Sequence, residues 1–199
     1  MQTCSSASDR ALRGCRGKAL QPRADLIVSY AMAKVHLVEG PVGAGKSTFA
    51  ASLAARTGGV HIALDEWFAR LFSPDRPPGD IAPWYLERKD RLLGLIWDHS
   101  RGILAADTDV ILEVGLIQRH QRSAFCERIR AGGFPPTIYV IDAPRELRRE
   151  RVRRRNSEKG ATFSMVVPDH IFEIASDMWE APDATECVEH RIEFIAAEY

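Results

Sequence analysis

A chain of 199 residues with 45% hydrophobic and 27% charged residues has the size and composition of an ordinary globular domain with a substantial core. Lysine plus arginine equals aspartate plus glutamate at 27 each, so no net field draws the protein to nucleic acid or to an anionic membrane. No apolar run reaches the roughly 20 residues of a membrane span, and the four cysteines show neither a CxxC pair nor metal-ligand spacing.

The amino-terminal segment differs from the rest of the chain. Residues 2–23 are rich in Ser, Arg, Ala and Gly, with Asp9 as their single acidic residue, and show no helical or strand periodicity. An organelle transit peptide shares this character, but no other feature supports one, and the apolar stretch of a secretory signal is missing. We therefore expect residues 1–31 to form a disordered extension, residues 32–199 to form the folded domain, and the protein to be cytoplasmic with reduced thiols.

From residue 34 onward, strand-like and helix-like segments alternate. Short apolar runs predict strands at 34–39, 60–64, 109–114 and 137–142. Helical periodicity and terminal signals predict helices at 46–56, 65–72, 84–104, 118–131, 145–155 and 169–179. Residues 187–194 suit either a last strand or a helix. The alternation predicts an α/β fold with a mainly parallel sheet.

The loop after the first predicted strand reads GPVGAGKST and matches G-x-x-x-x-G-K-[ST] at every fixed position. Glycines let backbone N–H groups wrap around a phosphate chain, and the helix that follows adds its positive N-terminus. We expect ATP and Mg²⁺ as cofactors, with Lys46 at the β- and γ-phosphates and Ser47 on the metal. The expected nucleotide-binding residues are Gly40, Pro41, Val42, Gly43, Ala44, Gly45, Lys46, Ser47 and Thr48.

The chain resembles small bacterial P-loop kinases that carry the label of AAA-family ATPases. These are similar to chloramphenicol phosphotransferase, zeta toxin and, more distantly, shikimate and gluconate kinases. The segments that carry the resemblance are GPVGAGKST, LDEWF, VILEVG and IDAPRELRRERVRRRN, within residues 34–182. The resemblance implies a three-layer α/β/α P-loop NTPase fold, kinase-like, with a lid at residues 155–168. It also implies transfer of the γ-phosphate of ATP to a hydroxyl of a small molecule.

Asp65 ends the second predicted strand, at the edge where ligands of open α/β sheets gather. The resembling kinases carry an aspartate there that accepts the proton of the acceptor hydroxyl, a role that suits a carboxylate. The alternative is that Asp65 caps the helix that follows. Glu66 is a second candidate, although we expect it to face solvent.

Glu113 ends the strand VILEV, where a carboxylate that serves Mg²⁺ is expected. The usual residue there is aspartate, so Glu113 could instead point into the acceptor site. Asp142 ends the next strand in the same way, and we interpret it as a cap or turn residue. The expected metal residues are therefore Ser47 and Glu113.

Seven arginines lie in the run of residues 145–155, with Glu146 and Glu150 between them. A solvated helix face with i,i+4 ion pairs accounts for most of them. Arg151 and Arg155 are four residues apart and match the R-x-x-x-R-N run that opens the lid in the resembling kinases. The resemblance implies that one clamps the β- and γ-phosphates and the other packs near the adenine or the lid hinge.

The expected catalytic residues are thus Asp65, Lys46, Arg151 and Arg155, acting on a small-molecule hydroxyl acceptor in a monomer or homodimer. Aromatic side chains near Asp65 could line the acceptor pocket, but core packing is the commoner use; they are Trp67, Phe68, Trp84 and Tyr85. Two alternatives stay open. One is a nucleotide-dependent regulatory module without an acceptor, and the other is a polynucleotide kinase, which the neutral charge disfavours.

Overall fold

The computed structural model describes residues 32–79, 81–160 and 163–196, and the predicted extension of residues 1–31 lies outside them. The strands are β1 (Val35–Glu39), β2 (Val60–Ala63), β3 (Val110–Glu113), β4 (Thr137–Asp142) and β5 (Arg191–Ala196). The α-helices are α1 (Lys46–Thr57), α2 (Leu64–Leu71), α3 (Ala82–Ala105), α4 (Arg119–Ala131), α5 (Arg145–Glu158), α6 (Asp169–Asp177) and α7 (Ala184–Glu189). A 3₁₀ turn, Ser73–Asp75, follows α2.

The strands form one sheet in the order β2-β3-β1-β4-β5, and every pairing is parallel. The P-loop strand β1 lies in the middle, paired with β3 on one side and β4 on the other. Parallel pairing brings the carboxyl ends of β1, β2 and β3 to one edge of the sheet. Ligands of open α/β sheets bind at that edge.

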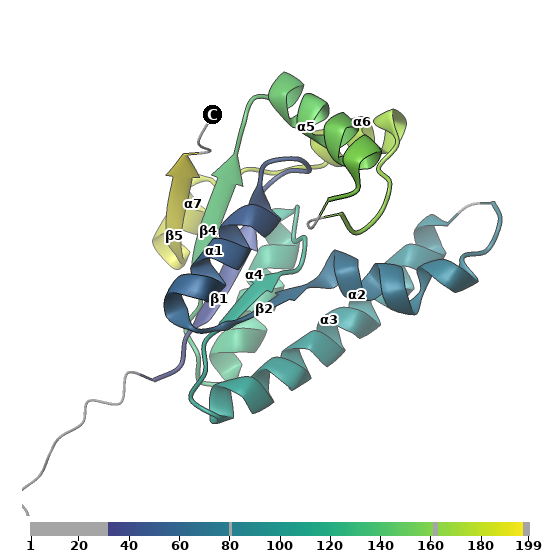
Figure 1. The fold of residues 1–199 in the computed structure, drawn as a ribbon. Coiled ribbons are helices and arrows are strands. Elements are labelled where there is room, and N and C mark those ends of the chain that lie inside the picture. The colour runs from purple at the N-terminus through teal and green to yellow at the C-terminus, as the bar shows by residue number, and fades with distance from the viewer. Residues whose placement is uncertain (1–31, 80, 161–162, 197–199) are drawn as a thin grey trace, which may run out of the picture. The chain divides into compact units, whose positions relative to one another are not determined.

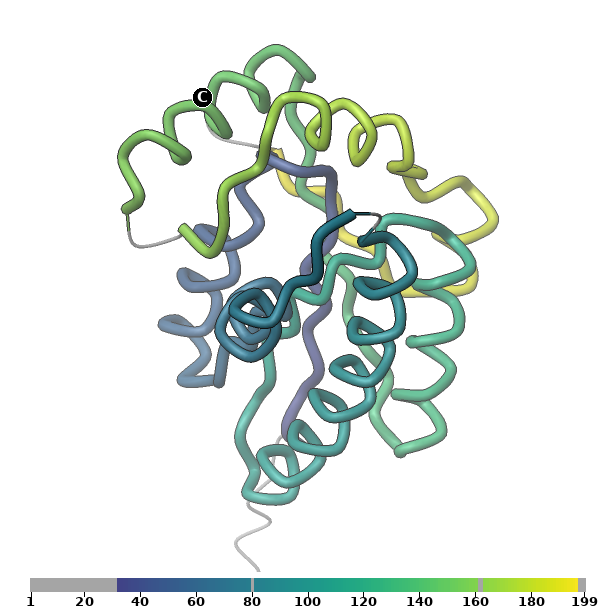
Figure 2. Tube along the Cα trace, turned by 90° about the vertical axis from the view of Figure 1, so that its right-hand side faces the viewer, coloured from purple at the N-terminus to yellow at the C-terminus, as the bar shows by residue number. Residues whose placement is uncertain are grey.

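Side chains on β1 alternate between two hydrophobic cores, one on each face of the sheet. Val35 and Leu37 belong to the core that α3 and α4 complete, whereas Val38 belongs to the core that α1 completes. Figure 2 shows α1 on one side of the strands and α3 and α4 on the other. The arrangement confirms the expected three-layer α/β/α fold.

Most element boundaries agree with the sequence within a few residues, and the carboxyl-terminal region shows the main difference. The stretch predicted as a strand or a helix contains both, because α7 ends at Glu189 and β5 begins at Arg191. Helix α5 also continues to Glu158, beyond its predicted end at residue 155. In Figure 1, α5 and α6 lie beyond the carboxyl ends of the strands, and α2 lies beside α3. No helix in the described part of the chain has the length and apolar character that a membrane span requires.

Candidate active site

The loop between β1 and α1 needs glycine where it passes close to other backbone segments. Gly40 has a φ of 148°, and a Cβ there would lie 2.0 Å from the carbonyl oxygen of Ile141. Gly43 has a φ of 80°, and its Cβ would lie 2.6 Å from the carbonyl oxygen of Arg148. Side chains would therefore push the loop away from β4 and α5, so glycine alone permits this conformation.

The start of α1 has the features of an anion site. Gly45 precedes the helix, and no side chain among the described residues caps it. The first N–H groups of a helix have no partner within it, and its dipole favours negative charge. Lys46 Nζ donates a hydrogen bond to the carbonyl oxygen of Pro41 at 3.0 Å, so its charge lies over the loop. Backbone donors and Lys46 together fit a phosphate chain.

A hydrogen-bonded group near the carboxyl ends of β2 and β3 consists of Ser47, Glu113 and His61. Ser47 Oγ donates to Glu113 Oε1 at 2.9 Å, and His61 Nε2 lies 3.3 Å from Glu113 Oε2. Burial raises the pKa of Glu113, but the bonds from His61 and Ser47 and the charge of Lys46 outweigh it and hold the pKa below its ordinary value. Glu113 is therefore an ionised carboxylate beside the P-loop hydroxyl.

The donor set at this position suits Mg²⁺, which prefers carboxylate and hydroxyl oxygens and retains several waters. The described residues contain no group of three His, Cys, Asp or Glu side chains that could hold a metal alone, so nucleotide oxygens and water would supply the other ligands. Asp142 does not share this position. It is exposed, and its Oδ1 accepts a bond from the N–H of Ala143 at 2.7 Å, which is the expected turn role.

Asp65 lies inside the first turn of α2 and does not cap the helix. The residue before the helix is Ala63, and no side-chain bond caps that end, so the capping interpretation is wrong. Asp65 is exposed to solvent, and desolvation by the surrounding protein raises the pKa of its carboxyl group. The Glu113 charge also raises this pKa, whereas Lys46, Lys89 and Arg155 oppose the rise.

Asp65 therefore lies within electrostatic reach of groups from the P-loop, β3, α3 and α5. Its neighbour Glu66 faces solvent as expected and pairs with Arg70 at 2.7 Å. Of the two acidic residues, Asp65 is therefore the one that interacts electrostatically with the expected nucleotide-binding residue Lys46.

Two residues of α3, Lys89 and Tyr85, border the same site. Sequence reasoning considered Tyr85 as a possible lining residue of the acceptor pocket and missed Lys89. Lys89 Nζ donates to the carbonyl oxygen of Gly115 at 2.7 Å. Burial lowers the pKa of Lys89, although Glu39 and Asp65 oppose the change. Burial also raises the pKa of Tyr85, and the Asp65 charge adds to the rise. A lysine in helical register with the buried Leu92 and Ile96 is the signal that could have revealed this position.

The arginines of α5 divide between two neighbours. Arg148 Nη1 donates to the carbonyl oxygen of Val42 at 3.1 Å, and Arg151 Nη1 to that of Ala44 at 3.4 Å, so both contact the P-loop. Arg155 lies within electrostatic reach of Asp65, and its buried Nε has no hydrogen-bond partner among the described residues. The expected pair, Arg151 and Arg155, thus faces the site.

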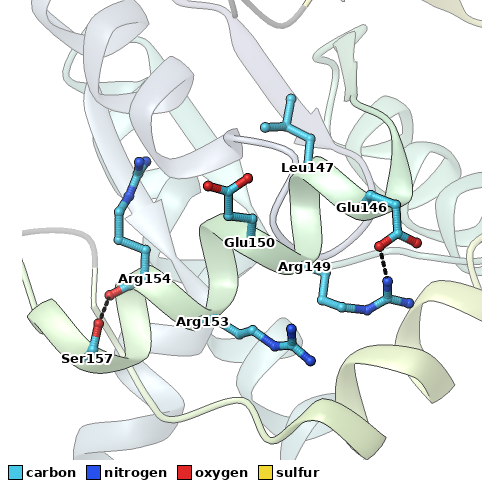
Figure 3. A pocket seen from close by; sticks show the side chains of 7 residues that line it. All are labelled: Glu146, Leu147, Arg149, Glu150, Arg153, Arg154 and Ser157. Carbon is cyan, nitrogen blue, oxygen red and sulfur yellow. Dashed lines mark hydrogen bonds and ion pairs between the residues drawn. The ribbon is translucent and has the colours of Figure 1, made fainter.

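Three other arginines of α5 hold α6, which corrects the interpretation of a solvated face with partners inside the helix. Arg145 and Arg149 both pair with Glu173, and Arg153 pairs with Asp169 at 2.6 Å. Arg149 also contacts Glu146, the intrahelical pair that remains. Figure 3 shows the outer side of this helix, where a hollow of about 670 Å³ has none of the expected site residues in its lining. Its lining is Glu146, Leu147, Arg149, Glu150, Arg153, Arg154 and Ser157.

The aromatic residues near Asp65 belong to the core. The Phe68 ring contacts the rings of Phe72, Trp84 and Tyr85, with centroid distances of 4.8–5.7 Å. Trp67, Trp84 and Tyr85 pack in part against the same core cluster. These rings join α2 to α3 and so fix the position of Asp65.

The fold and the P-loop define a nucleotide-binding protein with the architecture of P-loop kinases. Residues 35–173 match the model of the AAA_33 family, described as an AAA domain, and the chain belongs to this family. A comparison with curated protein sequences gives no significant match.

Solved structures share the fold at low sequence identity. A gluconokinase from Sinorhizobium meliloti has a TM-score of 0.52 at 18% identity, over 84% of this chain and 85% of its own. A sugar kinase from a Janibacter species has a TM-score of 0.57 at 16% identity, over 83% and 86%. Kti12 from Chaetomium thermophilum, solved with ADP-AlF3, has a TM-score of 0.63 at 15% identity, over 81% and 88%. They confirm the resemblance to small P-loop kinases.

Proposed function

We propose that this protein is an ATP-dependent phosphotransferase that moves the γ-phosphate of ATP to a hydroxyl group of a small molecule. The observation that carries the proposal is the position of Asp65 beside the P-loop, within electrostatic reach of Lys46 and Glu113 and open to solvent. A carboxylate there can orient a hydroxyl and take its proton as the new P–O bond forms.

The P-loop residues 40–48 would hold the nucleotide phosphates, and Ser47 and Glu113 would hold Mg²⁺. ATP bound there supplies the phosphoryl group, and Mg²⁺ offsets part of its negative charge. Lys46 lies where it can contact the β- and γ-phosphates, and Arg151 and Arg155 add charge from the α5 side. Asp65 faces this group from α2, on the acceptor side.

The raised pKa of Asp65 suits a general base, because a carboxyl with a higher pKa accepts a proton more readily once it is ionised. Lys89, next to it on α3, lies where its charge can attract an anionic group of the acceptor or of the phosphoryl being moved. Both features favour transfer to an acceptor over a module that only binds nucleotide.

A second candidate is a nucleotide-dependent module without an acceptor. The similar structures include Kti12 with ADP-AlF3, besides a gluconokinase and a sugar kinase. An ADP-release screen over a library of hydroxyl compounds separates the two. Release that depends on one acceptor class, together with the phosphorylated product in the mass spectrum, supports the kinase. If ADP is released at the same rate whatever compound is added, the result contradicts the kinase and favours the module.

A further inference from the structure

Glu39, the last residue of β1, is a buried carboxyl that the proposed phosphotransfer does not use. Its side chain is 0% exposed. Glu39 Oε2 accepts a hydrogen bond from the N–H of Leu116 at 2.9 Å, whereas Oε1 has no partner among the described residues. A buried carboxylate with an unpaired oxygen costs stability, so the position invites a functional explanation.

The partner of Glu39 is a turn that three elements hold at once. Lys89 of α3 donates to the carbonyl oxygen of Gly115, and Glu39 of β1 accepts from the N–H of Leu116. Arg122 of α4 donates to the carbonyl oxygen of Leu116 at 3.3 Å. The turn starts two residues after Glu113, and Gly115 has a φ of 64°. Its position therefore fixes how β3 ends.

The turn connects the two sides of the candidate site. Glu113 lies two residues before the turn and contacts Ser47, and Lys89 joins the turn to α3 beside Asp65. A shift of the turn would change both the Glu113–Ser47 contact and the distance between Lys89 and Asp65. Misplacement of reacting groups by about 1 Å can lower a rate about 100-fold.

We propose that Glu39 is a positioning residue whose ionised carboxylate holds the Gly115–Leu116 turn and thereby aligns Glu113 and Lys89 for phosphoryl transfer. The proposal rests on the proposed function. A bond from an N–H to a carboxylate is stronger than one to a neutral carboxyl, so ionisation tightens the turn.

The surroundings of Glu39 set the pH at which its carboxyl group ionises. Burial raises the pKa of Glu39 to about 7, against the opposing effects of the Leu116 N–H and of Lys46, Lys89 and Arg122. Cys126 of α4 also faces this charge, and burial, with a contribution from Glu39, keeps its thiol protonated. The charged groups that face Glu39 from α1, α3 and α4 are all cationic, and they oppose the rise of its pKa.

Two variants separate charge from shape, and the full chain is used throughout. Glu39→Met removes the acceptor and the buried charge at similar length, and Glu39→Gln keeps an acceptor without the charge. His36→Gln is the matched control, because His36 is also a buried polar residue of β1 with an unpaired ring nitrogen, and lies toward the other end of the strand. The measurements are hydrogen–deuterium exchange of residues 113–118 and ADP release from ATP-Mg²⁺ with water as acceptor, from pH 5.5 to 8.5.

For the wild type, kcat should rise with pH through about 7. Glu39→Met should speed exchange at residues 113–118 and lower kcat about 10- to 100-fold, with the KM for ATP little changed. Glu39→Gln should keep most of the exchange protection and lose the rise in kcat near neutral pH. His36→Gln should keep the wild-type exchange and pH profile.

Wild-type exchange in Glu39→Met overturns the proposal, because the carboxylate then does not hold the turn. Faster exchange with an unchanged kcat and pH profile also overturns it, since Glu39 is then only structural. If the wild type releases no ADP under any condition, the proposed function fails separately. In that case the exchange of residues 113–118 in Glu39→Met alone decides whether Glu39 holds the turn.

Discussion

The nucleotide side and the acceptor side of the candidate site are built in different ways. The proposed nucleotide side is residues 40–48, one continuous segment whose backbone and glycines would do most of the binding. The acceptor side is Asp65, Lys89 and the Gly115–Leu116 turn, which come from three separate parts of the chain. A continuous segment keeps its geometry through local backbone rules, whereas the acceptor side depends on long-range packing. Substitutions should therefore disturb the two sides differently.

The largest effect should come from the nucleotide side. Lys46→Ala should abolish ADP release, because it removes the charge expected at the phosphates. The free energy of unfolding should change by less than about 1 kcal/mol, since Lys46 makes one side-chain bond, to Pro41. ADP release and urea unfolding measure the two quantities. Lys34→Ala, at an exposed lysine, is the control and should keep full activity. Normal turnover in Lys46→Ala would remove the P-loop from the mechanism.

On the acceptor side, Asp65→Asn keeps the shape of the side chain and removes the proton acceptor. We expect kcat to fall about 10²- to 10⁴-fold with the dissociation constant of ATP nearly unchanged. Turnover and ATP binding should be measured on one preparation. Glu66→Gln changes the exposed acid of the same helical turn and should have almost no effect. Equal turnover in Asp65→Asn and the wild type would contradict the role of a base.

The acceptor side should also be sensitive to a buried ion pair that supports it. Arg122 bonds Glu186 through Nε and Nη2 at 2.6 and 2.8 Å, and both side chains are fully buried. Arg122→Met leaves Glu186 as an unpaired buried charge, so stability should fall by about 3–5 kcal/mol. The double variant Arg122→Met, Glu186→Leu should recover much of this loss. Chemical unfolding of the wild type, of Arg122→Met, of Glu186→Leu and of the double variant measures the coupling, and two additive losses would show that the pair does not act as a unit.

The raised pKa of Glu39 predicts how the free energy of unfolding depends on pH. Its folded pKa of about 7 lies above the ordinary 4.5, so the folded protein retains a proton that the unfolded chain has lost between these values. This contribution is fully present below pH 4.5 and is lost as pH rises to about 7, a decline of roughly 3 kcal/mol. Glu39→Gln should remove that decline from the unfolding free energy measured across the window. A decline of the same size in the variant would assign it to another group.

The smallest effect should come from the arginines that join α5 to α6. Arg153 and Asp169 pair at 2.6 Å, and both side chains are exposed. Arg153→Ala should lower the melting temperature only slightly, and the difference should vanish in high salt because exposed pairs are screened. ADP release should not change. A clear loss of turnover would show that α6 is more closely involved in the reaction than its contacts indicate.

The sequence predicts the nucleotide side well because its information is local. The fixed spacing of Gly40, Gly45, Lys46 and Ser47 specifies both the turn and the helix start. Alternation of strands and helices likewise predicts the sheet, and the structure confirms the three-layer fold. Asp65 could be proposed from the sequence because it follows a predicted strand at the ligand-binding edge.

The acceptor side could be predicted only in part, because its contacts join distant residues. Glu39 and Leu116, or Arg122 and Glu186, meet only once the sheet and its helices have assembled. The arginines of α5 show the same limit. Local spacing indicated partners inside the helix, whereas Glu173 and Asp169 of α6 compete for the same guanidinium groups. Periodicity predicts on which face of a helix a residue lies, but it does not predict which element packs against that face.

Asn156, near the end of α5, closes a loop. Its Nδ2 donates to the carbonyl oxygen of Val167 at 2.7 Å, and its Oδ1 accepts from the N–H of Val167 at 3.1 Å. One amide thus satisfies both backbone groups of Val167, two residues before α6, and joins the two ends of the segment expected to act as a lid. Closing a loop costs conformational entropy, and in the folded chain the two hydrogen bonds of Asn156 offset part of that cost without a bound substrate.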